Sequence, residues 1–122
     1  MAKFRLSQAA KDDIASILAT TAESFGAEAL RRYEKLVVVA LRDIASDPKR
    51  VGVKNRTEFG EGVCSYHLRY SRDRAKHDGV VVRCPRHLIL FREIEPELLG
   101  VGRVLYDAME IERHLPDGYA DP

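Results

Sequence analysis

The sequence has few cysteines and no metal-site pattern. Cys64 and Cys84 are the only two, and without a CxxC pair they are typical of buried or incidental thiols in a reducing compartment. A disulfide between them stays open at this point. A zinc site would need histidines at irregular spacing, and no glycine-rich phosphate loop occurs, so we expect no metal and no cofactor.

Membrane and export signals are also lacking. No stretch of about 18 consecutive apolar residues exists, which excludes a helix that crosses a membrane. The segment from Met1 to Leu6 lacks the apolar core of a secretory signal. We therefore expect a cytoplasmic protein with no membrane partner.

What the chain does have is the composition of a folded protein. It contains 122 residues, of which 45% are apolar and 32% are charged, and these proportions argue against disorder. The length suits one hydrophobic core. We therefore expect a single domain over residues 1–122.

Charge is unevenly distributed, although the net charge is only +1. Residues 49–92 carry eleven Lys or Arg against four Asp or Glu, whereas residues 93–122 carry two against eight. This asymmetry indicates a basic face for an acidic partner, either nucleic acid or an acidic protein segment. The alternative is that the two halves neutralise each other within the fold.

The N-terminus predicts a short strand followed by a helix. Lys3 to Leu6 alternates polar and apolar residues, and Ser7 is a suitable helix N-cap. Asp12 and Asp13 lie early in this helix, where carboxylates favour the positive end of the helix dipole. One apolar stripe follows at helical spacing: Ala10, Ile14, Ile17, Leu18 and Thr21.

A second helix is predicted from about Ala27 to Ala45. Gly26 ends the first helix, and Asp47-Pro48 stops the second, because proline disfavours a helical residue before it. A connection of one or two residues around Gly26 forces the two helices to run antiparallel. The apolar face of the second helix comprises Leu30, Tyr33, Val37, Ala40, Leu41 and Ile44.

The remainder of the chain predicts strands, so we expect an α+β fold. Both helices of the N-terminal hairpin should pack on one face of an antiparallel sheet, with a short helix at the C-terminus. Asp78-Gly79 is a turn signal that closes a charged segment from Ser71. The predicted strands are residues 63–68, 80–82, 87–92 and 101–106, with a loop at 51–62, a turn at 93–100 and a helix at 107–115.

No catalytic centre emerges from these patterns. Cys64 and His67 would lie on opposite faces of a strand, and no nucleophile stands next to a base and an orienting group. A ribonuclease is an alternative, since basic residues and histidines can hold a phosphodiester and move protons. We favour an exposed basic loop instead. The residues concerned are Arg69, Arg72, Arg74, Lys76, Arg83 and Arg86, with His67, His77 and His87.

Several segments, taken in order, resemble ParE-type toxins. The opening strand runs into a helix through Ser7, and the hairpin and second helix from Phe25 to Leu41 end at Asp47-Pro48. Two strand-like segments follow, GVCSY at residues 62–66 and HLILFR at residues 87–92. The closing segment GRVLYDAMEIERHL, residues 102–115, is the strongest part of the resemblance. The match covers roughly residues 3–115.

This resemblance implies a RelE-like fold and the toxin of a type II toxin–antitoxin module. ParE-type toxins that have been studied inhibit DNA gyrase, stabilise broken DNA and block replication. A ParD-type antitoxin neutralises them by wrapping its C-terminal segment around the toxin, while its N-terminal ribbon-helix-helix dimer binds the operator. The implied partners are therefore a ParD-type antitoxin and DNA gyrase, with operator DNA reached only through the antitoxin.

Relatives with the same fold cleave mRNA on the ribosome, and the sequence departs from their pattern. They use basic, tyrosine or histidine residues on the later strands and the C-terminal segment. Residues 107–112 here are Asp-Ala-Met-Glu-Ile-Glu, and carboxylates near a scissile phosphate would repel it. This departure favours a non-catalytic inhibitor over a ribosome-dependent mRNA endoribonuclease, which stays the alternative. A fold relative without toxicity is a third hypothesis.

A second departure is the stretch from Arg69 to Pro85, which is longer than the tight turn typical of the family. It could contact the antitoxin or the target, or it could be an inert loop. The physical expectation for neutralisation is an apolar groove between helices and sheet into which antitoxin side chains insert. Basic residues around this groove would pair with an acidic strand or helix of the antitoxin.

The resemblance also proposes site residues, none of them catalytic. Arg103 has an alternative role, because on a strand it could form a structural ion pair. The proposed antitoxin-binding residues are Arg32, Lys35, Arg42, Tyr66, Arg69, Arg86 and Arg92, and the proposed target-binding residues are His87, Arg103, Arg113 and His114.

Overall fold

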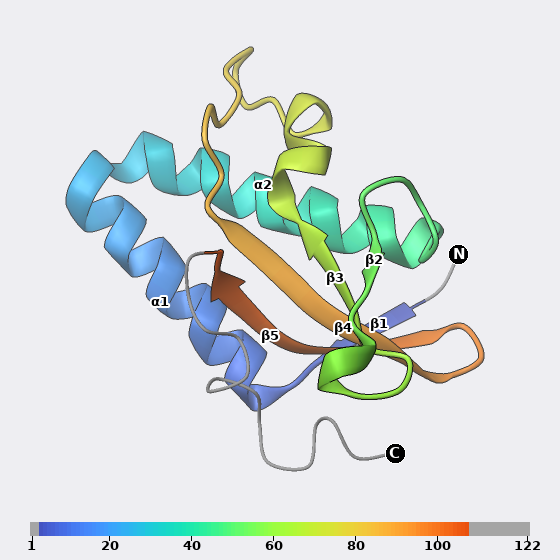
Figure 1. The fold of residues 1–122 in the computed structure, drawn as a ribbon. Coiled ribbons are helices and arrows are strands. Elements are labelled where there is room, and N and C mark those ends of the chain that lie inside the picture. Colours follow the sequence, from blue (N-terminus) through green and yellow to red (C-terminus); the bar gives the residue numbers. More distant parts are fainter. Residues whose placement is uncertain (1–2, 108–122) are drawn as a thin grey trace.

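Two helices pack on a five-stranded mixed sheet in the computed structural model, which describes residues 3–107 (Figure 1). The predicted α+β class with an N-terminal helical hairpin is confirmed. The predicted C-terminal helix, apart from Asp107, lies outside the described residues. The elements are β1 (Lys3–Leu6), α1 (Gln8–Phe25), α2 (Ala27–Ser46), β2 (Lys54–Asn55), β3 (Cys64–His67), β4 (His87–Glu95) and β5 (Leu98–Tyr106), with 3-10 helices η1 (Thr57–Phe59) and η2 (Leu68–Arg74).

The helical hairpin forms for the reasons that the sequence indicates. Ser7 caps α1, its Oγ accepting the Ala10 N–H at 2.9 Å. Gly26 alone joins the helices, and its φ of +91° is a conformation that side chains disfavour. Its N–H donates to the carbonyl of Ala22 at 2.9 Å, which closes the last turn of α1. Asp47 closes α2 in the same way through the carbonyl of Asp43 at 3.1 Å.

The sheet has the strand order β1-β5-β4-β3-β2. The pairs from β5 to β2 are antiparallel, whereas β1 runs parallel to β5, with Lys3 opposite Leu98 and Leu6 opposite Val101. The prediction of an antiparallel sheet is therefore wrong for this pair. Alternation in a sequence predicts a strand, but it does not say which strand lies beside it or in which direction.

Strand bounds also differ from the prediction. β4 and β5 form one long hairpin that turns at Pro96 and Glu97, where a wider turn was expected. The expected loop at residues 51–62 contains β2 and η1. Val80 to Val82 was expected to be a strand, but none of the strands of the sheet includes it. An apolar triplet can also line a pocket outside the sheet, and this one lines a pocket together with residues of α1 and α2.

We use the name β3–β4 connection for residues 68–86, which include η2. Its tip is a tight turn in which His77 and Val80 exchange two backbone hydrogen bonds of 3.0 Å. Asp78 and Gly79 have φ values of +51° and +76°, a pair of conformations that Asp-Gly sequences adopt readily. The turn predicted at Asp78-Gly79 is confirmed.

The hydrophobic core lies mainly between α2 and the sheet. Leu36, Ala40 and Ile44 of α2 are fully buried and belong to one cluster with Ile89 and Val101 of the sheet. The α1 stripe is less buried than expected. Ala10 is its one fully buried residue, while Ile14, Ile17 and Leu18 are partly buried against the same cluster. No helix within residues 3–107 has the length and apolar character needed to span a membrane.

Candidate functional site

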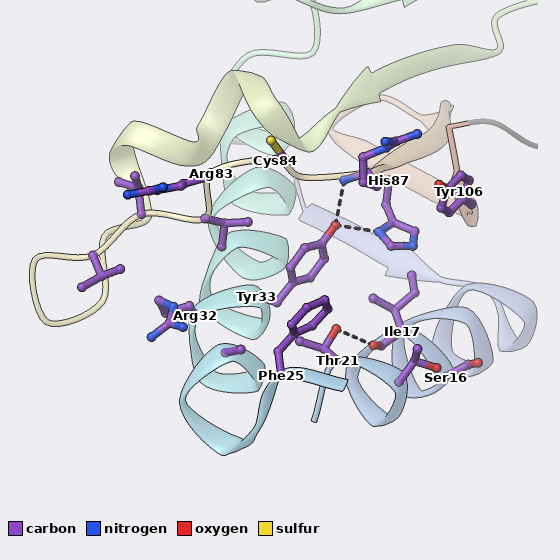
Figure 2. Close-up of a pocket in the computed structure, with 16 residues that line it drawn as sticks. Ser16, Ile17, Thr21, Phe25, Arg32, Tyr33, Arg83, Cys84, His87 and Tyr106 are labelled. Carbon is purple, nitrogen blue, oxygen red and sulfur yellow. Dashed lines mark hydrogen bonds between the residues drawn. The ribbon is translucent and has the colours of Figure 1, made fainter. Parts of the chain in front are cut away.

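A pocket of about 810 Å³ lies between the helical hairpin and the end of the β3–β4 connection (Figure 2). It has three walls: one from α1, one from α2 and one from the connection together with the adjoining ends of β4 and β5. The residues of these walls used below are Ile17 and Phe25 of α1, Ala29, Arg32 and Tyr33 of α2, Val80 to Cys84 and Arg86 of the connection, and His87 and Tyr106 of the sheet.

Apolar side chains around this pocket remain in contact with solvent. Phe25 is 78% exposed, Val80 is 47% exposed and Tyr106 is 41% exposed. Exposed apolar groups gathered around a hollow are typical of a surface that buries them against a ligand or a partner. The pocket is therefore the candidate binding site of the described residues.

Tyr33 and His87 form a hydrogen-bonded pair inside the pocket (Figure 2). The Tyr33 hydroxyl oxygen accepts the backbone N–H of Arg86 at 3.2 Å, so its own proton can be donated to His87 Nδ1 at 2.6 Å. Burial raises the pKa of Tyr33 to about 12. Burial also lowers the pKa of His87. Both side chains are therefore neutral at pH 7, and His87 carries its proton on Nε2.

A charged cluster lies beside the pocket, where β3 ends and β4 begins. Asp107 binds His67 Nε2 through Oδ2 at 2.9 Å and Arg86 Nε through Oδ1 at 3.2 Å. Burial alone would raise the pKa of Asp107, but the hydrogen bonds from His67 and Arg86 outweigh it and lower the pKa. The hydrogen bond to Asp107 raises the pKa of Arg86. Asp107 therefore offsets the charge of Arg86 and holds His67 in place.

This arrangement does not favour proton transfer to a substrate by His67. His67 Nδ1 accepts the backbone N–H of Arg69 at 3.1 Å, so both of its ring nitrogens are bonded within the protein. His87 is bonded to Tyr33, as described above. His77 lies apart from them, beside Glu28 and Asp78. The three histidines of the ribonuclease hypothesis are thus not brought to one point.

The predicted antitoxin-binding residues fall into three groups. Arg32 and Arg86 line the pocket. Tyr66 does not, since its side chain is fully buried in the core and cannot contact a partner in this conformation, so its assignment to a binding surface is corrected. The rest lie elsewhere on the fold: Lys35 bonds to the carbonyl of Lys76, Arg42 is exposed on α2, Arg69 stacks on Tyr70, and Arg92 is half-buried on β4.

The predicted target-binding residues are also dispersed. His87 lines the pocket. Arg103 forms an ion pair with Asp13, with Nε 2.6 Å from Oδ2 and Nη2 2.8 Å from Oδ1, which is the structural alternative raised from the sequence. Its hydrogen bond to Asp13 raises the pKa of Arg103. Arg113 and His114 lie outside the described residues.

Sequence reasoning missed several residues of the pocket. Tyr33 was expected on the apolar face of α2, and it does lie there, but its hydroxyl group also binds Arg86 and His87. Phe25 was named only as the first residue of the segment that resembles the family's hairpin. The apolar triplet Val80 to Val82 was the available signal for the third wall, since a short apolar run after a charged segment must pack against something.

Both cysteines are free thiols, so the sequence's open question of a disulfide is answered. Cys64 is half-buried and Cys84 is exposed on the pocket wall.

Possible metal ligands gather at one place among the described residues, where Glu28, His77 and Asp78 bring their ligand atoms within 4.8 Å of one another. Glu28 already pairs with Arg31 at 2.5 Å, and such exposed groups are common without an ion. The absence of a metal stays a prediction.

Comparison of the sequence with protein-family models and with curated proteins finds no match. The candidate site therefore stands on its geometry. That geometry provides an apolar pocket, neutral hydrogen-bonding groups inside it, and arginine side chains at its edge. Such a site is chemically suited to bind apolar and acidic groups.

Proposed function

We propose that this chain is the toxin of a type II toxin–antitoxin module with a RelE/ParE-like fold. In this proposal it inhibits DNA gyrase and blocks replication in the cytoplasm, and a ParD-type antitoxin neutralises it. Operator DNA is contacted only through the antitoxin. The observation that carries the proposal is the apolar pocket between hairpin and sheet, with arginines at its edge, which matches the groove expected for antitoxin side chains.

Binding accounts for the site better than catalysis does. The His67 ring is engaged at both nitrogens, and Asp107 places a carboxylate beside Arg86, where an RNA phosphate would be repelled. Cleavage of mRNA needs a general base and a general acid that are free to exchange protons with the substrate. These contacts support a protein that acts by binding its target.

The function is tested by inducing the gene in a bacterial host and by assaying the purified protein twice. We expect arrested growth, loss of supercoiling by gyrase, and intact mRNA in a translation reaction. Cleaved mRNA with unaffected supercoiling would contradict the proposal and favour the endoribonuclease. Normal growth, with no effect in either assay, would indicate a relative of the fold that has no toxicity.

The antitoxin part is tested with the product of a neighbouring reading frame that begins with a ribbon-helix-helix sequence. Ala29 lines the pocket, so Ala29→Trp should fill it and weaken binding of this product by about tenfold or more in calorimetry. Ala27→Trp is the matched control, because Ala27 is exposed on the same helix and is not a pocket residue. Equal binding by both variants would place the antitoxin elsewhere.

A further inference from the structure

The 3-10 helix η2 presents two arginines on one face. A 3-10 helix has three residues per turn, so side chains that are three residues apart lie on the same face. Leu68 and Ser71 form the face that is turned into the fold, and both are buried. Arg69 and Arg72 form another face, and both are exposed. The two arginines therefore lie one above the other, about 6 Å apart along the helix axis.

Both arginines are oriented by neutral groups. Arg69 Nη2 donates a hydrogen bond of 3.0 Å to the Tyr70 hydroxyl group, and its guanidinium carbon lies 4.9 Å from the centroid of the Tyr70 ring. Arg72 Nη1 donates to the carbonyl of Arg83 at 2.8 Å. Within residues 3–107, neither side chain forms an ion pair with a carboxylate. These contacts position the two guanidinium groups without neutralising their charge, so an anion that binds there orders little of the protein.

Two lysines extend this surface beyond η2. Lys76 is exposed two residues after the helix ends, and Lys35 of α2 donates a hydrogen bond to the backbone carbonyl of Lys76. Neither lysine pairs with a carboxylate in the described part of the chain. In Figure 1, η2 is the yellow-green coil that leads into the loop projecting past the helices. We use the name basic stripe for four residues: Lys35, Arg69, Arg72 and Lys76.

The positive charge of the stripe is not balanced within the described residues. Residues 68–86 contain six Lys or Arg and two Asp or Glu. Asp43 pairs with Arg74, and Asp107 pairs with Arg86. Between the connection and residue 107, Asp107 is the one acidic residue that forms such a pair. The basic and acidic halves of the chain therefore do not neutralise each other at this surface, and its charge attracts an acidic partner.

The surroundings of the stripe suit a duplex phosphate backbone. None of its four residues lines the apolar pocket. The adjacent Tyr70 ring already contacts Arg69, lies 5.8 Å from the Tyr66 ring between centroids, and packs on Gly52, where a Cβ atom would be 2.6 Å from it. It is therefore not free to stack on an unpaired base, which is a common way to hold single strands. Phosphates of a duplex need only cations that are in position.

We propose that the basic stripe binds the phosphate backbone of duplex DNA. Arg69 and Arg72 bind phosphates from one face of η2, and Lys35 and Lys76 extend the contact beyond the end of this helix. The contact reads no base, so recognition of an operator sequence is left to the antitoxin. That the DNA is the duplex on which gyrase acts rests on the proposed function. Lys35 and Arg69 were assigned to the antitoxin through the resemblance, and this inference assigns them to DNA.

The test measures binding of the full chain to a fluorescein-labelled DNA duplex of about 24 base pairs and arbitrary sequence. Fluorescence anisotropy is recorded from about 50 to about 200 mM salt, and we expect a Kd of about 1–100 µM at physiological salt. The logarithm of the association constant should fall by about 0.9 per phosphate contact for each tenfold rise in salt. Arg69→Gln combined with Arg72→Gln should weaken binding by about tenfold or more and reduce this slope by about 2.

A second variant, Arg69→Gln combined with Lys76→Gln, removes two stripe charges and keeps the hydrogen bond from Arg72 to the Arg83 carbonyl. Its affinity and its salt slope should fall as in the first variant. A loss of binding in the second variant is thus not explained by loosening of the connection. Circular dichroism of each variant confirms that the chain is folded.

The matched control is Arg5→Gln combined with Lys11→Gln. It removes two positive charges at exposed positions outside the stripe and should leave affinity within about twofold. The proposal is overturned if the duplex does not bind, if neither stripe variant changes the salt slope, or if the control weakens binding as much as they do. It is also overturned if an RNA duplex, a single strand or an acidic peptide binds the stripe more tightly than the DNA duplex does.

The inference and the proposed function can fail separately. A chain that arrests growth and inhibits gyrase, but whose stripe variants bind DNA as the native chain does, keeps its function and loses this assignment. A chain that binds duplex DNA through the stripe, but leaves growth and supercoiling unchanged, keeps the DNA surface and loses the toxin function.

Discussion

Tyr33 of α2 links the helical hairpin to the end of the sheet where β4 begins. Its hydroxyl group accepts a hydrogen bond from the Arg86 backbone and bonds to the His87 ring. The His87 ring also meets the ring of Tyr106 edge to face, at 5.9 Å between centroids. One hydroxyl group therefore helps to fix both the end of the β3–β4 connection and the orientation of the pocket histidine.

The stability of the protein should depend on pH through this pair. The pKa of Tyr33 is raised to about 12 in the folded state, so its contribution is complete below pH 10 and is lost as the pH rises through 12. The loss amounts to about 2–3 kcal/mol in the free energy of unfolding. His87 acts in the opposite pH range. Its pKa is lowered by burial, so stability should fall as the pH drops below about 6.5.

Urea unfolding followed by circular dichroism from pH 5 to pH 12 measures both effects. Tyr33→Phe should remove the alkaline loss attributed to this hydroxyl, and it should cost about 1–3 kcal/mol at pH 7 because two partly buried hydrogen bonds are lost. Tyr106→Phe is the control, since Tyr106 is 41% exposed. Burial also raises the pKa of Tyr66, so part of the alkaline loss remains in every variant. An alkaline loss unchanged by Tyr33→Phe would contradict this account.

At the scale of the elements, the β3–β4 connection is attached to α2 by a buried acidic residue. Asp43 is 3% exposed and accepts a hydrogen bond of 2.7 Å from Ser71, which in turn bonds to Tyr66 at 2.7 Å. Arg50 and Arg74 lie 3.4 and 3.3 Å from its other oxygen. A buried carboxylate needs such partners, because an unpaired charge in the core is costly. This network holds η2 against α2.

Asp43→Ala should therefore loosen the connection as well as destabilise the protein. We expect a loss of about 3 kcal/mol in the free energy of unfolding and faster cleavage by trypsin within residues 68–86. Mass spectrometry of the fragments identifies the cleaved bonds. Asp73→Ala is the control, because Asp73 is exposed in the same 3-10 helix. Cleavage at equal rates in both variants would show that Asp43 does not secure this segment.

Local structure was predictable wherever the signal lay in neighbouring residues. The hairpin follows from the helical stripes, the Ser7 cap and Gly26, and the turn follows from Asp78-Gly79. The parallel pairing of β1 with β5 joins residues such as Lys3 and Leu98, and no local pattern encodes such a distant partner. The path of Val80 to Val82 was missed for a related reason, since an apolar triplet packs equally well in a sheet or on a helix.

The candidate site was predictable only in part. Arg32, Arg86 and His87 were named through the resemblance, and all three line the pocket. The pairing of Arg86 with Asp107 could not be foreseen, because the distance of 21 residues between them says nothing about contact. Tyr66 was placed on a binding surface, although it lies in the core. A tyrosine on a strand has the same appearance in a sequence whether its face is covered or open.

At the scale of the whole molecule, the side chains of Ser7 and Asp13 join the start of α1 to the last described strand. Ser7 Oγ donates to the Gly102 carbonyl at 2.7 Å. Asp13 forms its two-point ion pair with Arg103, and its Oδ2 also accepts the Val104 N–H at 3.0 Å. The β1 pairing covers β5 only as far as Val101, so Asp13 satisfies a backbone donor on the edge that β1 leaves open. These contacts give Asp13 a structural role, whereas the sequence analysis explained it by the helix dipole.

Changes at Asp13 should therefore lower global stability in a graded way. Asp13→Ala removes the ion pair and the acceptor for Val104, and should cost about 2–3 kcal/mol in the free energy of unfolding. Asp13→Asn keeps an oxygen for the Val104 N–H and should cost less. Asp12→Ala should cost below about 0.5 kcal/mol, because Asp12 is exposed and, within residues 3–107, its side chain accepts only from Gln8. The chain has no tryptophan, so urea unfolding is followed by circular dichroism and by tyrosine fluorescence.

The circular dichroism and fluorescence signals should change together in every variant, since hairpin and sheet share one core. A helical signal that unfolds before the tyrosine signal, or equal costs for the Asp12 and Asp13 variants, would show that this contact does not join the two parts.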